Sequence, residues 1–165
     1  GMDVYPGDPE VQIEEVQSLE KDGWQLKRLV LGSHTGTHLD VPYHMTAQGI
    51  KLDELPLERC FGDAIMVRVE SEFPKHVGLV FRSDELTEEL LPKFIQASTP
   101  FVVVGDSATL SVELERQLLQ RDILTFTDLT NLSELPDDQH FAFYGIPLKI
   151  KDGDGSPIRA FAILP

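Results

Sequence analysis

Four side chains that could do chemistry together lie in one short segment, SHTGTHLDVPYHM, which covers residues 33–45. They are His34, His38, Asp40 and His44, and their even spacing puts them on one face of an extended chain. Two imidazoles and a carboxylate combine neutral nitrogen with anionic oxygen, a donor set that suits Zn²⁺, Mn²⁺ or Fe²⁺. The segment therefore predicts a metal site held by His34, His38 and Asp40.

The chain must bend within this segment for the four side chains to meet. A straight strand from His34 to His44 would span roughly 33 Å, which is too long for one site. Gly36 and Pro42 are the expected bends. A helix would place His34 and His38 at positions i and i+4, but the interior glycine and the neighbouring threonines disfavour a helix. A further alternative is a set of hydrogen-bonded strand and loop histidines that hold no ligand.

An ion held by three protein ligands keeps coordination positions open for water, which is typical of catalytic rather than structural sites. We expect a metal-bound hydroxide to be the nucleophile and the ion to polarise a substrate carbonyl. His44 lies one bend further along the chain. It is the expected acid/base catalyst, which carries a proton to the leaving group.

Composition and charge argue against several other classes of function. The formal net charge is −14, whereas nucleic-acid binding needs clustered Lys and Arg to contact phosphates. No apolar run approaches the roughly 20 residues that span a bilayer. The single cysteine, Cys60, agrees with a reducing compartment. We therefore expect a cytoplasmic protein that binds neither nucleic acid nor membrane, folded as one domain over residues 2–165.

Short apolar and β-branched runs, bounded by glycine, proline and acidic residues, predict a sheet. Residues 11–16 and 24–33 are expected to form paired strands, and residues 63–70 a third strand. The run PFVVVGD over residues 100–106 is apolar enough for a buried central strand. Further strands are expected over residues 123–129, 140–150 and 157–164, the last two joined by a Gly and Asp hairpin at KDGDGS.

Leucines at helical spacing predict helices over residues 83–98 and 111–122. Ser83 and Ser111 are the expected N-caps, since each is followed by acidic residues in the first turn. Pro92 is expected to end or kink the first helix. The whole pattern indicates a mixed α/β fold with more sheet than helix.

The pattern H-x-G-T-H-x-D-x-P-x-H, unbroken from His34 to His44, resembles the signature of the Putative cyclase family. This family of metal-dependent hydrolases includes bacterial kynurenine formamidase and isatin hydrolase. The segments VYPGDP, LTNLSEL and IPLKIKDGDGSPIRAFAIL also resemble the family, at its opening loop, its late Asn-Leu segment and its close. The resemblance implies a swivelling β/β/α fold, a homodimer or larger homo-oligomer, and hydrolysis of a small amide, formamide or cyclic amide.

Carried over by residue, the resemblance makes His34, His38 and Asp40 metal ligands and His44 the catalytic acid/base. The family takes two further ligands, a histidine and a glutamate, from its second half. Alignment on LTNLSEL puts Glu115 and Thr127 at those two positions.

These two changes bear on the metal that the resemblance implies. A neutral hydroxyl at Thr127 is a poor substitute for a carboxylate that can bridge two ions, so we expect one divalent ion rather than two. Glu115 could supply a carboxylate instead of an imidazole, which would favour Mn²⁺ over Zn²⁺. A slip of one residue would offer Asp128 instead of Thr127, but it would turn that side chain to the other face of the strand.

Two functions remain open at this point. The first is a metal-dependent, arylformamidase-like hydrolase acting on a small molecule. The second is a degenerate family member whose incomplete metal site serves as a non-catalytic binding or oligomeric module. An acidic protein-interaction domain without a pocket is a third reading, which only the charge favours.

Overall fold

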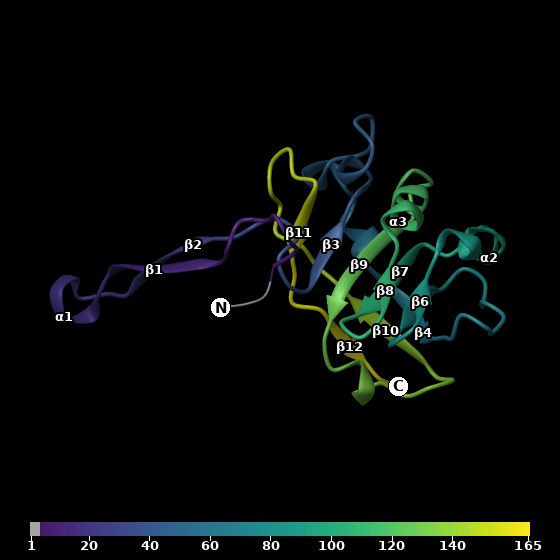
Figure 1. The fold of residues 1–165 in the computed structure, drawn as a ribbon. Coiled ribbons are helices and arrows are strands. Elements are labelled where there is room, and N and C mark those ends of the chain that lie inside the picture. The colour runs from purple at the N-terminus through teal and green to yellow at the C-terminus, as the bar shows by residue number, and fades with distance from the viewer. Residues whose placement is uncertain (1–3) are drawn as a thin grey trace.

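A computed structural model describes residues 4–165, and its centre is an eight-stranded mixed sheet (Figure 1). The strand order is β11-β3-β9-β7-β5-β4-β10-β12. Strands β4, β5, β7 and β9 run parallel to one another, and the outer strands pair antiparallel. The bounds are β3 His38–Asp40, β4 Phe61–Met66, β5 Gly78–Phe81, β7 Phe101–Gly105, β9 Leu124–Leu129, β10 His140–Tyr144, β11 Gly155–Pro157 and β12 Phe161–Ile163.

The remaining elements are short. The α-helices are α1 Leu19–Asp22, α2 Leu91–Ala97 and α3 Val112–Leu119, and the 3-10 turns are η1 Pro42–His44, η2 Leu52–Glu54, η3 Leu57–Cys60, η4 Glu88–Leu90 and η5 Leu132–Glu134. Two small sheets pair β1 Gln12–Gln17 with β2 Leu26–Val30 and β6 Glu85–Leu86 with β8 Thr109–Leu110. The predicted mixed α/β fold with more strand than helix is confirmed. Among the described residues, no helix is long and apolar enough to cross a membrane.

The middle of the central sheet is buried on both faces. Its parallel strands β5 and β7 are fully buried, as expected of near-continuous apolar runs. One core cluster, around Phe126 and Phe143, fills one face, and a second cluster packs Phe94 and Leu114 of α2 and α3 against the other. The predicted central strand over residues 100–106 is therefore confirmed. A sheet packed in this way is a rigid support for side chains at the ends of its strands.

The predicted helix over residues 83–98 is wrong in its first half. Residues 85–86 form β6, and α2 begins only at Leu91, preceded by a 3-10 turn. Ser83 is therefore not its N-cap, and Pro92 lies in its first turn rather than at its end. The reason is that a first-turn residue has no intrahelical N–H bond to lose, so proline starts a helix as readily as it ends one. Ser111 does cap α3, since its hydroxyl accepts a hydrogen bond from the Leu114 amide at 3.1 Å.

The predicted hairpin at KDGDGS is confirmed. Strands β10 and β12 pair antiparallel, and nearer the turn Pro147 pairs with Ile158 in the same register. The returning arm also contains β11, which pairs with β3 at the other edge of the eight-stranded sheet. Gly155 makes this close pairing possible, because a Cβ there would lie 2.7 Å from the Leu39 carbonyl oxygen and 2.5 Å from His34 Cε1. The pairing of β11 with β3 brings Asp154 beside the histidine segment.

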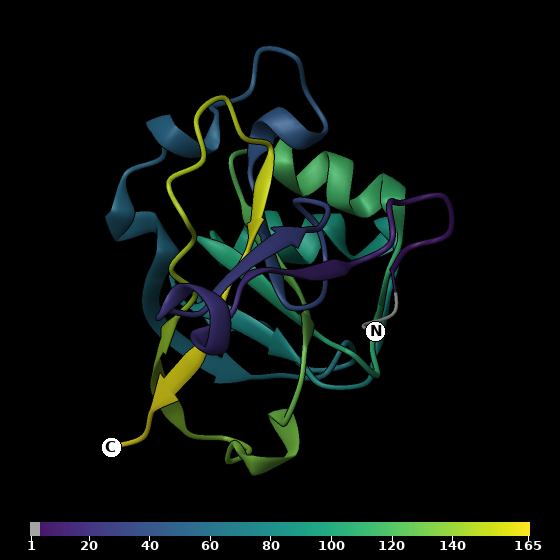
Figure 2. The ribbon, with the colours of Figure 1, turned by 90° about the vertical axis from the view of Figure 1, so that its left-hand side faces the viewer.

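Strands β1 and β2 form an arm that stands away from the body, with α1 at its tip (Figure 1); the same arm points toward the viewer in Figure 2. Their antiparallel pairing confirms the prediction of paired strands near the start of the chain. Almost all of their side chains are exposed, including Ile13 and Leu29, which face each other across the arm and are each 63% exposed.

Candidate metal centre

The segment over residues 33–45 bends at the two places that the sequence predicts. Gly36 has a left-handed φ of 62°, a conformation that glycine adopts without steric cost. Strand β3 follows, and the 3-10 turn η1 then begins at Pro42 and ends at His44. The segment is therefore a loop, a short strand and a turn rather than a helix, and its four predicted side chains converge.

Three of these side chains form a group of potential metal ligands. The Nδ1 atom of His34 lies 2.6 Å from Oδ1 of Asp40, and the Nε2 atom of His38 lies 3.4 Å from the same oxygen. One ligand atom from each residue lies within 4.8 Å of the others. His38 and Asp40 are buried and His34 is half-buried.

In both His34 and His38, the ring nitrogen that does not face Asp40 lies within hydrogen-bond distance of another acceptor. His38 Nδ1 lies 2.6 Å from the Gly36 carbonyl oxygen, and His34 Nε2 lies 2.8 Å from Oδ2 of Asp154. A ring nitrogen that donates to such an acceptor leaves the other nitrogen as a lone-pair ligand. His38 Nε2 and His34 Nδ1 would therefore be the atoms offered to a cation, and both face Asp40. The residues present fit a divalent cation.

Charge within the group is balanced by protons when no cation is bound. Burial alone raises the pKa of Asp40, but its hydrogen bonds with His34 and His38 hold that pKa well below its usual range. Burial lowers the pKa of His34, but Asp40 and Asp154 outweigh burial and raise it to about 9. The pKa of His38 is raised in the same way, chiefly by Asp40 acting against burial. A cation would compete with these protons for the same side chains.

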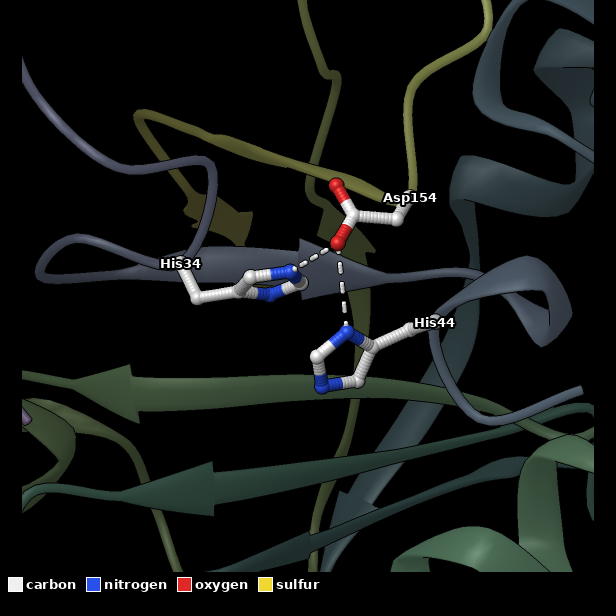
Figure 3. Close-up of side chains that lie close together, drawn as sticks. All are labelled: His34, His44 and Asp154. Carbon is white, nitrogen blue, oxygen red and sulfur yellow. Dashed lines mark hydrogen bonds and ion pairs between the residues drawn. The ribbon is translucent and has the colours of Figure 1, made fainter. Parts of the chain in front are cut away.

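His44 lies beside the ligand group. Its Nδ1 atom is 3.3 Å from Oδ2 of Asp154, and its ring centroid is 3.9 Å from that of His34 (Figure 3). Burial alone raises the pKa of Asp154, but the hydrogen bonds from His34 and Ser33 and the pairing with His44 lower it to about 2. When an ionised Asp154 accepts a hydrogen bond from Nδ1 of His44, Nε2 of His44 is left for proton transfer.

Thr127, at the altered glutamate position, lies against the ligand atoms. The β3–β9 register pairs it with His38, and its hydroxyl oxygen is 2.9 Å from His38 Nε2 and 3.4 Å from Asp40 Oδ2. Asp128, the alternative after a one-residue slip, has a left-handed φ of 56° and an exposed carboxylate 3.9 Å from His38 Nδ1. The Thr127 hydroxyl, rather than the Asp128 carboxylate, is therefore the group of β9 that lies beside His38 Nε2 and Asp40.

Glu115 is separated from the ligand group by one hydroxyl. Thr125 Oγ1 lies 3.1 Å from the Glu115 carboxylate and 3.3 Å from Oδ2 of Asp40. The Thr125 hydroxyl can donate its one proton to only one of these two carboxylates, so a hydrogen bond with the other carboxylate needs a second proton. Burial, followed by the nearby charge of Asp40, raises the pKa of Glu115 to about 7, which makes Glu115 the carrier of that proton near neutral pH.

Two residues at this site were missed in the sequence. Thr125 lies two residues before Thr127 and so shares its face of β9. The period of two along a strand could therefore have identified Thr125 from the sequence. Asp154 lies in the closing segment that resembles the family, but its sequence separation from His34 is 120 residues. Only the pairing of β11 with β3 brings it to the histidines.

An open cleft of about 1100 Å³ lies against this group. All of the predicted site residues line it, including Glu115 and Thr127. Among the described residues that line the cleft, none is Lys or Arg, and the carboxylates are Asp8, Asp40, Asp106, Glu115 and Asp128. A separate cavity of about 410 Å³, on the side of β12, shares only Thr37 and Thr130 with the cleft.

Comparison with known proteins places these features in a family. The family described as Putative cyclase matches residues 1–106. The uncharacterized protein MJ0783 of Methanocaldococcus jannaschii is 31% identical over 97% of this chain and 92% of its own length. Kynurenine formamidase of Salinibacter ruber is 29% identical over 95% of this chain and 89% of its own.

Solved structures show the same fold. An isatin hydrolase bound to the product analogue thioisatinate superposes with a TM-score of 0.78 at 20% identity, over 99% of this chain and 87% of that one. Isatin hydrolase A from Labrenzia aggregata gives a TM-score of 0.81 at 18% identity, over 99% of this chain and 88% of that one. The cyclase-like fold expected from the resemblance is thus confirmed.

Proposed function

Because the chain belongs to the Putative cyclase family, we propose that it is a metal-dependent hydrolase of small amides. His34, His38 and Asp40 hold the cation, and His44 is the acid/base catalyst. One observation carries this proposal: three ligand atoms converge while the second nitrogen of each ligand ring already has an acceptor.

Each residue has a separate task in this reaction. A divalent ion bound there would lower the pKa of a water molecule and polarise the amide carbonyl. Asp40 supplies the negative charge that holds the ion, and burial keeps solvent from screening it. His44 is placed to take a proton from the attacking water and to donate one to the departing nitrogen.

We propose an aryl formamide or a related small amide as the substrate class. The relative that supports this class is the kynurenine formamidase, at 29% identity over most of both chains. The cleft is large enough for a small organic molecule. Because its charged lining is acidic apart from histidine, an amide without a carboxylate is favoured over an anionic one.

We propose one ion, Zn²⁺ or Mn²⁺, rather than two. Two imidazoles and a carboxylate suit either metal. The hydroxyl of Thr127 stands where the family has a carboxylate, and Glu115 is hydrogen-bonded to Thr125 and half-protonated near pH 7. Glu115 remains a candidate fourth ligand, which would have to leave Thr125 to reach the ion.

We propose that the protein is a homodimer or larger homo-oligomer. A two-stranded arm is marginal on its own in water, and this one exposes Ile13, Val16, Trp24 and Leu29. A second copy of this chain is the proposed cover of that apolar surface. We also propose a cytoplasmic location, with which the single, buried Cys60 agrees.

Metal content and hydrolysis, measured together, test the proposed function. Protein purified without chelator is expected to hold about one Zn²⁺ or Mn²⁺ per chain and to hydrolyse formanilide only with metal. His38→Ala is expected to lose both properties, whereas His140→Ala, which alters an exposed histidine paired with Asp63, keeps both. A parent that binds neither metal, or a folded His38→Ala variant equal to the parent, would instead favour a non-catalytic binding module.

A further inference from the structure

Asp154 reaches from the loop before β11 to two histidines with different roles (Figure 3). We propose that Asp154 is a positioning residue, which holds His34 and His44 in the orientations and tautomers that metal binding and proton transfer require. The inference rests on the proposed function, since it assumes that His34 is a ligand and His44 the acid/base.

One carboxylate oxygen serves both rings. Oδ2 of Asp154 lies 2.8 Å from His34 Nε2 and 3.3 Å from His44 Nδ1. A carboxylate oxygen accepts two hydrogen bonds, so both ring nitrogens can donate to it at once. The two rings lie against each other with their centroids 3.9 Å apart, so neither turns without moving its neighbour.

An acceptor at these atoms decides which nitrogen of each ring carries the proton. A neutral imidazole has one N–H donor and one lone pair. With its N–H on Nε2, His34 presents the lone pair of Nδ1 to the side where Asp40 lies. With its N–H on Nδ1, His44 keeps the lone pair of Nε2 for a substrate or water proton. Without Asp154, each ring could adopt the other tautomer, and a fraction of molecules would lose the ligand or the base.

The backbone around Asp154 is fixed. The Asp154 carbonyl oxygen accepts from the Val41 amide at 3.2 Å, and the Gly153 carbonyl oxygen accepts from the Leu52 amide at 2.9 Å. Val41 lies between β3 and η1, so the loop is tied to the segment that carries the histidines. Gly155 completes the arrangement, because any side chain there would meet the His34 ring.

The same three side chains are also close enough to bind a cation of their own, since one ligand atom from each of His34, His44 and Asp154 lies within 4.8 Å of the others. That role would require His34 to bind ions through both nitrogens and to give up its last proton. A ligand histidine ordinarily donates its second N–H to a carboxylate, as here. Positioning therefore accounts for the geometry with less disturbance, and the metal count separates the two roles.

The test uses Asp154→Asn and Asp154→Ala, with Asp152→Asn as the matched control. Asp152 lies in the same loop and loses the same charge, but its carboxylate pairs with Lys51 rather than with an imidazole. Asn keeps the shape of Asp154 but can turn its NH₂ group to the rings, so it no longer dictates the tautomers. It also carries the test if the alanine variant folds poorly.

Three readouts are measured: the tautomer of His44 by long-range ¹H–¹⁵N NMR of the metal-free protein, Zn²⁺ affinity by competition, and kcat and KM for formanilide. We expect both Asp154 variants to show mixed His44 tautomers. The alanine variant should bind Zn²⁺ about 10–100-fold more weakly and lose kcat with little change in KM. Asp152→Asn should match the parent.

An unchanged His44 tautomer and unchanged Zn²⁺ affinity in both Asp154 variants would overturn the inference. So would a parent that binds two ions and an alanine variant that binds one, because Asp154 would then be a ligand. A parent that binds no metal refutes the proposed function instead, and the NMR measurement on the metal-free protein still decides whether Asp154 sets the tautomer.

Discussion

Binding of a divalent cation is expected to release protons from this protein at pH 7.5. Both nitrogens of His34 face carboxylates, Asp40 on one side and Asp154 on the other, and together they raise its pKa to about 9 against the effect of burial. A metal binds only the neutral ring, so the ion must displace a proton that the two carboxylates stabilise.

The magnitude follows from that pKa. At pH 7.5, a group with a pKa of about 9 is about 97% protonated, so His34 alone releases about one proton. His38, whose pKa is also raised, adds a further fraction. While His34 titrates, the apparent affinity rises about tenfold for each pH unit from pH 7 to 9 and then levels off.

Isothermal titration calorimetry with Zn²⁺ in buffers of different ionisation enthalpy measures this count directly. The slope of observed enthalpy against buffer enthalpy should correspond to at least one released proton at pH 7.5 and to fewer at pH 9.5. His140→Ala should leave the slope unchanged. A stoichiometric titration that releases no protons at pH 7.5 would refute the assignment of His34 as a ligand.

Three further predictions concern stability and the altered ligands. Without metal, the contribution of His34 to stability is complete below its ordinary pKa of 6.5 and is lost as the pH rises through about 9. The free energy of unfolding in urea should fall by about 3 kcal/mol across that range on account of His34, and His34→Ala should leave only the part of the fall that comes from His38; a flat profile in the parent would contradict this. Gly155→Ala should lower the free energy of unfolding by about 1–3 kcal/mol and weaken Zn²⁺ binding, because its Cβ would press on His34 and the Leu39 carbonyl; equal thermal stability and affinity would contradict this. The double variant Glu115→His, Thr127→Glu should raise the bound metal from one ion to two per chain, measured by elemental analysis, and an unchanged content would show that ligand type alone does not set the count.

Much of the fold was readable because its signals are local. The run at residues 101–105 is apolar without interruption, and burial on both faces of the sheet follows from that composition. Ser111 was recognisable as an N-cap because its partner, the Leu114 amide, is three residues away. Pro92 was misjudged because proline is compatible with a helix start and a helix end, and only the pairing of β6 with β8 excludes the longer helix.

The pairing of β11 with β3 was beyond local rules. The Gly and Asp turn predicts the hairpin from neighbouring residues alone, and Pro147 does pair with Ile158 across it. Gly155 also lets the returning arm pair closely with β3, a contact with a segment more than 100 residues earlier. Asp154 reaches the histidines only as a result of that pairing, so no spacing rule could have found it.

The sequence by itself determined the donor set, the two bends and the location of the candidate site, because residue type and short-range spacing decide which atoms are available and where glycine and proline turn the chain. Tertiary structure alone decided which nitrogen of His34 faces Asp40. That choice depends on what the other nitrogen donates to, which is a carboxylate 120 residues away for His34, whereas for His38 it is a local carbonyl two residues away. It also decided that Thr125 separates Glu115 from the group, since the positions of α3 and β9 set that distance.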